Sequence, residues 1–249
     1  MESLVIDIGN TRTKVALFNK GELQLNYPVI TFTSDDLEFF LKEHPNINRA
    51  IVSSGKENQE KLISSLKKWI PFFIELDHNT LLPIENCYET TETLGKDRIA
   101  AAIGANKLFP DQNILVIDAG TAITYDFISK KNQYKGGFIT PGLNMRFKAL
   151  NHFTDKLPLL KPEMPQDYEG NNTINSIRGG IQHGLYGEVN QMIEYFSDLY
   201  SDISIILTGG DATYFERLLI NYNFVVPEIT LFGLNTILEF NYNQTTEML

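Results

Sequence analysis

One short phrase that could bind phosphate occurs twice in this sequence. Leu-Val-Ile-Asp-x-Gly stands at residues 4–9 and again at 115–120, and in each copy a threonine follows six residues after the aspartate. The glycine allows a tight turn and removes the Cβ that would keep a ligand away from the backbone. Two such turns facing each other across a cleft would bind a polyphosphate from both sides. The two aspartates, Asp7 and Asp118, would hold a metal ion between them.

The residues after each glycine determine what the turn could bind. In the first copy they are Asn10, Thr11 and Arg12, followed by Lys14, which adds a point positive charge. In the second copy Thr121 follows the glycine, and its N–H and O–H groups could also face phosphate oxygens. A single copy is explained equally well by a hairpin turn with an aspartate cap. The repetition is what favours phosphate binding.

A second group of charged residues, Leu94-Gly95-Lys96-Asp97-Arg98, precedes an alanine-rich stretch that predicts a helix over 99–107. The positive end of a helix favours anions. Two interpretations stay open from these residues alone. Asp97 caps the helix while Lys96 and Arg98 are solvated, or the group binds an anionic substrate.

Composition restricts the class of protein. The 249 residues include 43% hydrophobic and 21% charged residues, which is ordinary for a globular chain with a sizeable core. The net charge of −10 argues against nonspecific nucleic-acid binding, which needs a basic surface. We expect neither a membrane helix, which needs ~18 apolar residues, nor a signal peptide. The single cysteine, Cys87, and only four histidines argue against disulfides and structural zinc, so a cytoplasmic protein is expected.

Apolar periodicity predicts the same order of elements in both halves of the chain. Strands are expected at 3–9, 13–19, 23–31, 50–53, 114–119, 122–128, 134–140 and 203–208. Helices are expected from Ser34, at 57–69, 99–107, 142–152, 174–199 and 211–221, and from Thr230. Prolines and a glycine predict a long loop over 157–172. Strand hairpins followed by strand–helix alternation, given twice, indicate a duplicated α/β unit.

Six motifs together resemble the acetate and sugar kinase/Hsc70/actin superfamily, and within it the sequence is similar to type III pantothenate kinases. They lie at Asp7–Lys14, Tyr88–Arg98, Asp118–Asp126, Gly136–Gly142, Asn172–Thr173 and Thr208–Gly210. Each motif is weak alone, but together they keep the order of that family. The resemblance implies an α/β fold of two ribonuclease H-like (actin-like ATPase) domains with a cleft between them. The halves would be residues 1–112 and 113–249.

The resemblance also implies an activity, which is transfer of the ATP γ-phosphate to the primary hydroxyl of pantothenate. The product would be 4'-phosphopantothenate, at the first step of coenzyme A biosynthesis. Asp97 matches the family's proton acceptor for that hydroxyl. The substrate-binding residues would be Tyr88, Gly95, Lys96, Asp97, Arg98 and Thr173, with the Arg98 guanidinium suited to the pantothenate carboxylate.

For the cofactors, the resemblance assigns both repeated turns to ATP and their aspartates to metals. The ATP-binding residues would be Asp7, Ile8, Gly9, Asn10, Thr11, Arg12, Thr13, Lys14, Gly120 and Thr121. Asp7 would bind Mg²⁺, and Asp118 would bind a monovalent cation, K⁺ or NH₄⁺.

A homodimer is the expected assembly, because the family's counterpart of Thr173 reaches the substrate site of the neighbouring subunit. The helix at 174–199 carries an apolar stripe that could form the interface, or that could equally pack in the chain's own core. Other roles stay open. Arg146 and His152 could reach the substrate or be surface and capping groups, and Gly209-Gly210 could approach the nucleotide or form a tight turn.

Two other classes of function compete with this interpretation. A different kinase or phosphatase of the same superfamily would not need the stretch Gly95–Arg98. A catalytically inactive regulatory relative would not need Asp7, Lys14, Asp97 and Asp118 all intact.

Overall fold

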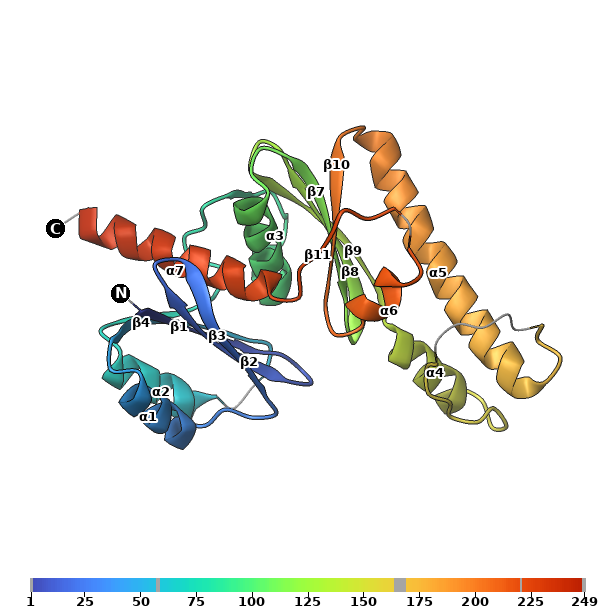
Figure 1. Ribbon diagram of the computed structural model, residues 1–249, viewed down its shortest axis with the longest axis horizontal. Coiled ribbons are helices and arrows are strands. Elements are labelled where there is room, and N and C mark those ends of the chain that lie inside the picture. Colours follow the sequence, from blue (N-terminus) through green and yellow to red (C-terminus); the bar gives the residue numbers. More distant parts are fainter. Residues whose placement is uncertain (1, 57–58, 164–168, 220, 248–249) are drawn as a thin grey trace. The chain divides into compact units, whose positions relative to one another are not determined.

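The computed structural model describes residues 2–56, 59–163, 169–219 and 221–247 (Figure 1). The chain forms two compact units. The first consists of residues 1–111, 132–135 and 228–249, and the second of 112–131 and 136–227. The expected division into halves at residues 112 and 113 stays a prediction, and the C-terminal segment belongs to the first compact unit.

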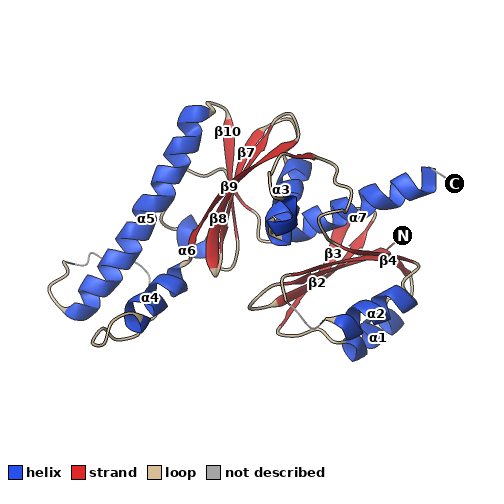
Figure 2. Ribbon diagram, turned by 180° about the vertical axis from the view of Figure 1, so that it is seen from behind, coloured by secondary structure: helices blue, strands red, loops and turns tan. Residues whose placement is uncertain are grey.

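The first unit is built on a five-stranded sheet with the order β3-β2-β1-β4-β5. β1 pairs antiparallel with β2 and parallel with β4, and β4 pairs parallel with β5. The strands are β1 (Glu2–Ile8), β2 (Thr13–Asn19), β3 (Glu22–Val29), β4 (Ile47–Ser54) and β5 (Phe72–Glu75). Most of β1 is buried, as expected for a central strand with helices on both faces (Figure 2).

Alternate residues of β1 face different helices. One face packs against α1 (Ser34–Glu43) and α2 (Glu60–Trp69) in an apolar cluster. On the opposite face, the Ser3 hydroxyl donates a hydrogen bond to Asn235 of α7 (Ile229–Glu247) at 2.9 Å. Asp7 has the same parity as Ser3, so it belongs to the face that α7 covers.

Helix α3 (Lys96–Leu108) and helix α7 approach each other very closely. A Cβ added to Gly233 of α7 would lie 1.7 Å from the carbonyl oxygen of Ala100, and one added to Gly104 would lie 2.0 Å from that of Ile229. Residues 98–105 are all buried. The small residues of α3 are therefore explained by the contact of two helix backbones as well as by helix propensity.

The second unit contains a sheet with the order β11-β10-β7-β8-β9. Its strands are β7 (Asn113–Ala119), β8 (Ala122–Ser129), β9 (Gln133–Pro141), β10 (Ile203–Thr208) and β11 (Phe224–Val225). A short strand, β6 (Glu85–Asn86), pairs with Gln133 and Tyr134 at the start of β9, and these four residues belong to the first unit.

The two sheets repeat one topology. In each, a central strand pairs antiparallel with the next strand and parallel with a later one: β1 with β2 and β4, and β7 with β8 and β10. The order β3-β2-β1-β4-β5 thus corresponds to β9-β8-β7-β10-β11. This confirms the predicted duplicated α/β fold.

Three helices complete the second unit: α4 (Leu143–His152), α5 (Thr173–Leu199) and α6 (Ala212–Glu216). The apolar stripe of α5 lies against the sheet in the unit's own core, with Met192 partly buried and the others buried: Ile177, Ile181, Leu185, Val189 and Phe196. Of the two interpretations of that stripe, the structure shows core packing.

The sequence-based elements differ from the observed ones at several ends. The short strands β5, β6 and β11 were not predicted, because two to four residues give too little periodicity. Helix α3 begins at Lys96 instead of residue 99, and α6 ends at Glu216 instead of residue 221. Residues 57–58 and 220 of two predicted helices, and 164–168 of the predicted loop, lie outside the described residues. Within the described part of the chain, no helix has both the length and the apolarity to cross a membrane.

Candidate active site

The first repeated turn joins β1 to β2, and a backbone hydrogen bond closes it. The N–H of Gly9 donates to the carbonyl oxygen of Arg12 at 3.0 Å. The side chains of Asn10, Thr11 and Arg12 are exposed. The polar groups of this turn therefore reach the surface, where a phosphate could meet them.

Two of the residues expected at the nucleotide have buried side chains. Ile8 is 4% exposed and Thr13 is 2% exposed, and they pair with each other across β1 and β2. Their side chains fix the strands on either side of the turn, so only their backbone groups could face a ligand.

Asp7 lies between two polar neighbours on adjacent strands, Lys14 on β2 and Ser53 on β4. Burial is the largest cause of a raised pKa of about 6 for Asp7. The Lys14 charge lowers this pKa, the nearby Asp97 carboxylate raises it, and a hydrogen bond with the Ser53 side chain lowers it. The first unit therefore brings Asp7, Lys14 and Asp97 to one place.

Asp97 lies in the first turn of α3. The N-cap position belongs to Gly95, and the Asp97 carboxylate accepts a hydrogen bond from the N–H of Arg98 at 2.9 Å. Asp97 is therefore not the helix cap that one interpretation of the sequence required. Its carboxylate lies at the positive end of α3, beside the group around Asp7.

Arg98 is a buried cation that lies over one aromatic ring. Its guanidinium carbon lies 5.6 Å from the centroid of the Tyr88 ring, and Arg98 is 5% exposed. The Tyr88 ring in turn lies 6.2 Å from that of Tyr134. The segment before Tyr88 is fixed by a hydrogen bond from the N–H of Cys87 to the carbonyl of Tyr134 at 3.0 Å. These contacts bring together two predicted substrate residues, Tyr88 and Arg98.

Lys96 lines a small pocket of the first unit. The pocket has a volume of about 180 Å³, and Asp77, His78 and Leu94 also line it. Gly95 and Lys96 directly precede Asp97, as the N-cap and the first residue of α3.

The second repeated turn, between β7 and β8, lies in the second unit. The N–H of Gly120 donates to the carbonyl of Ala122 at 3.0 Å, and the N–H of Gly142 donates to the carbonyl of Thr121 at 3.1 Å. The second turn is therefore one residue tighter than the first and is supported from outside by Gly142.

Gly209 lies against Asp118. Gly209 has a φ of 94°, and a Cβ added to it would lie 2.4 Å from Asp118 Oδ1 and 2.4 Å from the carbonyl oxygen of Ala119. The N–H of Asp211 donates to the same carbonyl at 2.8 Å. The Gly209-Gly210 turn therefore approaches the second repeated turn closely, besides reversing the chain between β10 and α6.

Thr173 opens α5 and is exposed, and Asn172 caps this helix by accepting a hydrogen bond from the N–H of Asn175 at 3.0 Å. A pocket of about 970 Å³ is lined by residues of α4 and α5, Thr173 among them, and by residues between the two helices such as Phe153. Phe153 is 80% exposed. Thr173 thus borders a large pocket of its own unit with an exposed aromatic rim.

The structure also places the two residues whose roles were open. Arg146 forms an ion pair with Glu188 at 2.7 Å and is an internal contact of the second unit. His152 is the last residue of α4 and exposed, with its ring against that of Phe153, which fits a surface group.

The site residues fall in both units: Asp7 to Lys14, Tyr88 and Gly95 to Arg98 in the first, and Asp118, Gly120, Thr121 and Thr173 in the second. Among the described residues, no group of three or more His, Cys, Asp or Glu side chains could hold a metal ion. A metal ion would therefore need oxygen ligands from its substrate or from water besides a protein carboxylate.

Sequence reasoning missed Ser53 and Glu188. Ser53 lies one residue before the end of β4, which is the parallel neighbour of β1. Polar residues at the ends of parallel neighbouring strands were a signal that could have identified it. Glu188 lies in the middle of α5, where no local pattern distinguishes it from a solvated helix residue.

The raised pKa of Asp7 predicts a pH-dependent cost to stability. Because this pKa rises from 3.8 unfolded to about 6 folded, the contribution of Asp7 to stability is fully present below pH 4 and is lost as pH rises through 6. Without nucleotide or divalent cation, Asp7→Asn should raise the free energy of unfolding by about 3 kcal/mol at pH 7.5. The gain should be about 1 kcal/mol smaller at pH 5. Denaturant unfolding of both proteins at the two pH values measures it, and an equal gap at both would contradict the assignment.

Comparison with known proteins identifies the family. Residues 3–195 match the family model of type III pantothenate kinases. A type III pantothenate kinase of Phocaeicola vulgatus is 40% identical over 240 residues, which cover 96% of this chain and 98% of the relative. One of Cytophaga hutchinsonii is 41% identical over 239 residues, which cover 96% and 99%.

Solved structures show the same fold at low sequence identity. A Campylobacter jejuni protein assigned to the Baf family of transcriptional activators has a TM-score of 0.62 and 22% identity, covering 96% of this chain and 99% of that one. A glucokinase from an Antarctic psychrotroph has a TM-score of 0.54 and 14% identity, covering 96% and 99%. These likenesses concern the fold, whereas the family model matches residues 3–195 and the Phocaeicola vulgatus relative, at 40% identity, covers 96% of the chain. By these matches, the chain belongs to the type III pantothenate kinase family.

Proposed function

We propose that this pantothenate kinase uses Asp97 as the proton acceptor and the two repeated turns as its phosphate loops. Membership of the family makes the protein an ATP-dependent kinase of coenzyme A biosynthesis. The observation that carries the proposed site is the convergence of Asp7, Lys14 and Asp97 within the first unit. Pantothenate-dependent release of ADP, compared with acetate or common sugars as acceptors, tests the choice of substrate.

The proposed roles follow from the needs of phosphoryl transfer. Its transition state is loose, so positioning and charge neutralisation account for most of the catalysis. Asp97 would orient the primary hydroxyl of pantothenate and accept its proton. Arg98, held beside Tyr88, would pair with the pantothenate carboxylate. Lys14 and the N–H groups of the first turn would neutralise the β- and γ-phosphates.

Asp7 is the residue that would hold Mg²⁺, directly or through water. Its raised pKa shows that Lys14 and Ser53 together do not compensate for the burial of an ionised carboxylate, which is the deficit that a divalent cation removes. When bound with ATP, Mg²⁺ supplies charge neutralisation at the phosphates. One carboxylate is sufficient, because Mg²⁺ usually keeps several waters.

Asp118 is the residue that would hold a monovalent cation, K⁺ or NH₄⁺. Its Oδ1 atom and the carbonyl oxygen of Ala119 both lie near Gly209, which provides oxygen donors beside the second turn. An ion there would bring positive charge to the phosphates without a protein cation.

A homodimer with shared substrate sites is the proposed assembly. The stripe of α5 is buried in the second unit and does not support an interface, so the proposal rests on Thr173 and the pocket that it borders. Phe153 and Ile174 are exposed apolar residues near Thr173 that a partner would cover. Thr173 would then close the pantothenate site of the partner against water.

Asp97→Asn should lower kcat by about 10²–10⁴-fold, which is the usual contribution of a positioned general base. The fold should survive, because the two side chains have the same shape. Asp35→Asn is a matched control, since Asp35 is the second residue of α1 as Asp97 is of α3, and Asp35 is exposed. Steady-state kinetics and thermal unfolding of both variants provide the test. A loss of activity that only follows a loss of stability would contradict a catalytic role.

Activity should require K⁺ or NH₄⁺ and should fall when Na⁺ or Li⁺ replaces them, because Asp118 would bind the larger ions. Asp118→Asn should lower the rate and also flatten its dependence on K⁺ concentration. Initial rates at a series of K⁺ concentrations measure both effects. Full activity of the unmodified protein without K⁺ and NH₄⁺ would show that this cation assignment is wrong.

Mixing two impaired chains tests whether sites are shared. Asp97→Asn and Thr173→Ala should each be impaired alone. In a mixed dimer with shared sites, one site carries both lesions and the other carries none, so mixing should raise activity above the sum of the separate proteins. Mixing two separate preparations of Asp97→Asn is the control. No rescue, or a fully active monomer on a sizing column, would contradict shared sites.

A further inference from the structure

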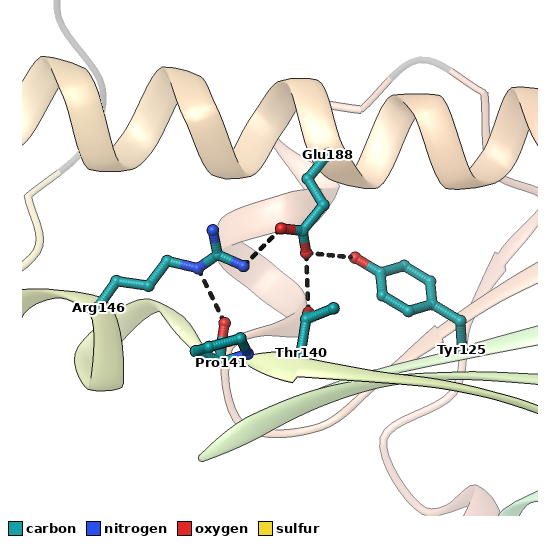
Figure 3. Close-up of polar contacts among 5 residues, drawn as sticks. All are labelled: Tyr125, Thr140, Pro141, Arg146 and Glu188. Carbon is teal, nitrogen blue, oxygen red and sulfur yellow. Dashed lines mark hydrogen bonds and ion pairs between the residues drawn. The ribbon is translucent and has the colours of Figure 1, made fainter. Parts of the chain in front are cut away.

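Four elements of the second unit meet at one carboxylate. Glu188 of α5 accepts hydrogen bonds from the Tyr125 hydroxyl of β8 at 3.2 Å and the Thr140 hydroxyl of β9 at 2.8 Å (Figure 3). It also accepts one from Arg146 of α4 at 2.7 Å. Glu188 and Arg146 have side chains only 25% and 21% exposed. Burying a carboxylate costs free energy unless well-placed hydrogen-bond donors replace the lost water. The positions of the three donors around Glu188 therefore matter for stability.

The donors of this cluster are fixed in their roles. Tyr125 is fully buried, and burial, followed by the Glu188 charge, raises its pKa, so its hydroxyl keeps its proton and donates. Arg146 uses two separate nitrogen atoms. One donates to Glu188, and its Nε donates to the carbonyl oxygen of Pro141 at 2.9 Å. Only the planar fork of an arginine can bridge the two acceptors in this way.

Glu188 therefore holds both residues that precede Gly142: Thr140 directly and Pro141 through Arg146 (Figure 3). Gly142 in turn lies against the second repeated turn. Its N–H donates to the carbonyl of Thr121 at 3.1 Å. A Cβ on Gly142 would lie 2.2 Å from the carbonyl oxygen of Gly120 and 2.4 Å from that of Thr121. Any shift of Gly142 must therefore move this turn or break its support.

We propose that Glu188 is a positioning residue for ATP: through Thr140 and Arg146 it fixes the Pro141-Gly142 segment against which the Gly120-Thr121 phosphate loop rests. Glu188 does not touch the nucleotide. It determines where the N–H groups of the loop point, and a shift of that loop weakens every phosphate contact it makes. The inference rests on the proposed role of Gly120 and Thr121.

A graded pair of variants tests it. Glu188→Ala removes all three acceptor contacts and should raise the KM for ATP about tenfold, whereas Glu188→Gln keeps the shape and part of the bonding and should raise it about two- to threefold. The KM for pantothenate should change less than twofold in both, because the proposed positioning concerns the phosphate loop. Glu194→Ala, an exposed glutamate on the same helix, should change neither constant.

Gly120→Ala separates failure of this inference from failure of the proposed site. A Cβ on Gly120 would lie 3.7 Å from its nearest neighbours, so the unliganded protein can accommodate the added methyl group. A phosphate bound close to the backbone of Gly120 would clash with that methyl group. If Gly120→Ala leaves the KM for ATP unchanged, the assignment of the loop to ATP is wrong. If Gly120→Ala raises it and folded Glu188→Ala does not, the positioning role is overturned. A rise in the pantothenate KM alone would assign the cluster to the pocket between α4 and α5 and would also overturn it.

The test does not depend on Glu188→Ala folding. Thr140→Val removes one hydroxyl donor at similar size and should raise the KM for ATP about two- to fivefold. Combined with Glu188→Gln it should give less than the product of the two single effects, because both act through the same contact. A fully multiplicative double variant would show that the two residues act independently and would overturn the proposed chain of contacts.

Discussion

The close contact between the backbones of α3 and α7 is the constraint on which the first unit depends. Gly233 and Ala100 meet with no room for a side chain between them, and Gly104 meets Ile229 in the same way. α7 is also tied to the sheet, since Asn235 accepts a hydrogen bond from Ser3 of β1. α3 is thereby held at a set distance from β1. The position of its first turn, with Asp97, relative to Asp7 follows from this packing of small residues.

In that position the negative charge of Asp7 is not fully compensated by neighbouring groups of the protein. Asp7 is a half-buried carboxylate with Asp97 nearby, and Lys14 and Ser53 only partly offset the cost. Such unresolved charge is typical of functional sites, where a ligand completes the compensation. In a kinase of this family, Mg²⁺ and ATP are the groups proposed to do so. The uncompensated charge would lower the stability of the unliganded protein, and its compensation would contribute to the free energy of binding Mg²⁺ and ATP.

In the second unit, hydrogen bonds to one carboxylate hold the elements beside the repeated turn in place. The repeated turn of this unit is one residue tighter than that of the first unit, and it is supported from outside by Gly142 and by the Gly209 turn. Gly142 is in turn held by the Glu188 cluster, in which one carboxylate accepts hydrogen bonds from β8, β9 and α4. Apolar packing could hold these elements together, but it is not directional. Hydrogen bonds to a carboxylate fix both distance and angle, which a loop that must orient N–H groups requires.

The duplicated α/β order, the two Asp-x-Gly turns and the charged group at residues 95–98 could be predicted from the sequence, because strand periodicity, turn residues and helix ends are local signals. The family motifs, which are also local, identified the kinase.

Local patterns could not decide whether the stripe of α5 faces a partner or its own core, because the amphipathic pattern of a helix does not show what covers its apolar face. They could not show that Asp97 lies inside the first turn of α3 instead of capping it, since a helix end depends on packing as well as on its cap. Above all, the contacts of Asp7 with Asp97, and of Glu188 with Tyr125, Thr140 and Arg146, join residues that are 42 to 90 positions apart and lie on separate elements. Such contacts depend on the packing of whole elements, because side chains distant in sequence interact only once the backbone has brought their elements together.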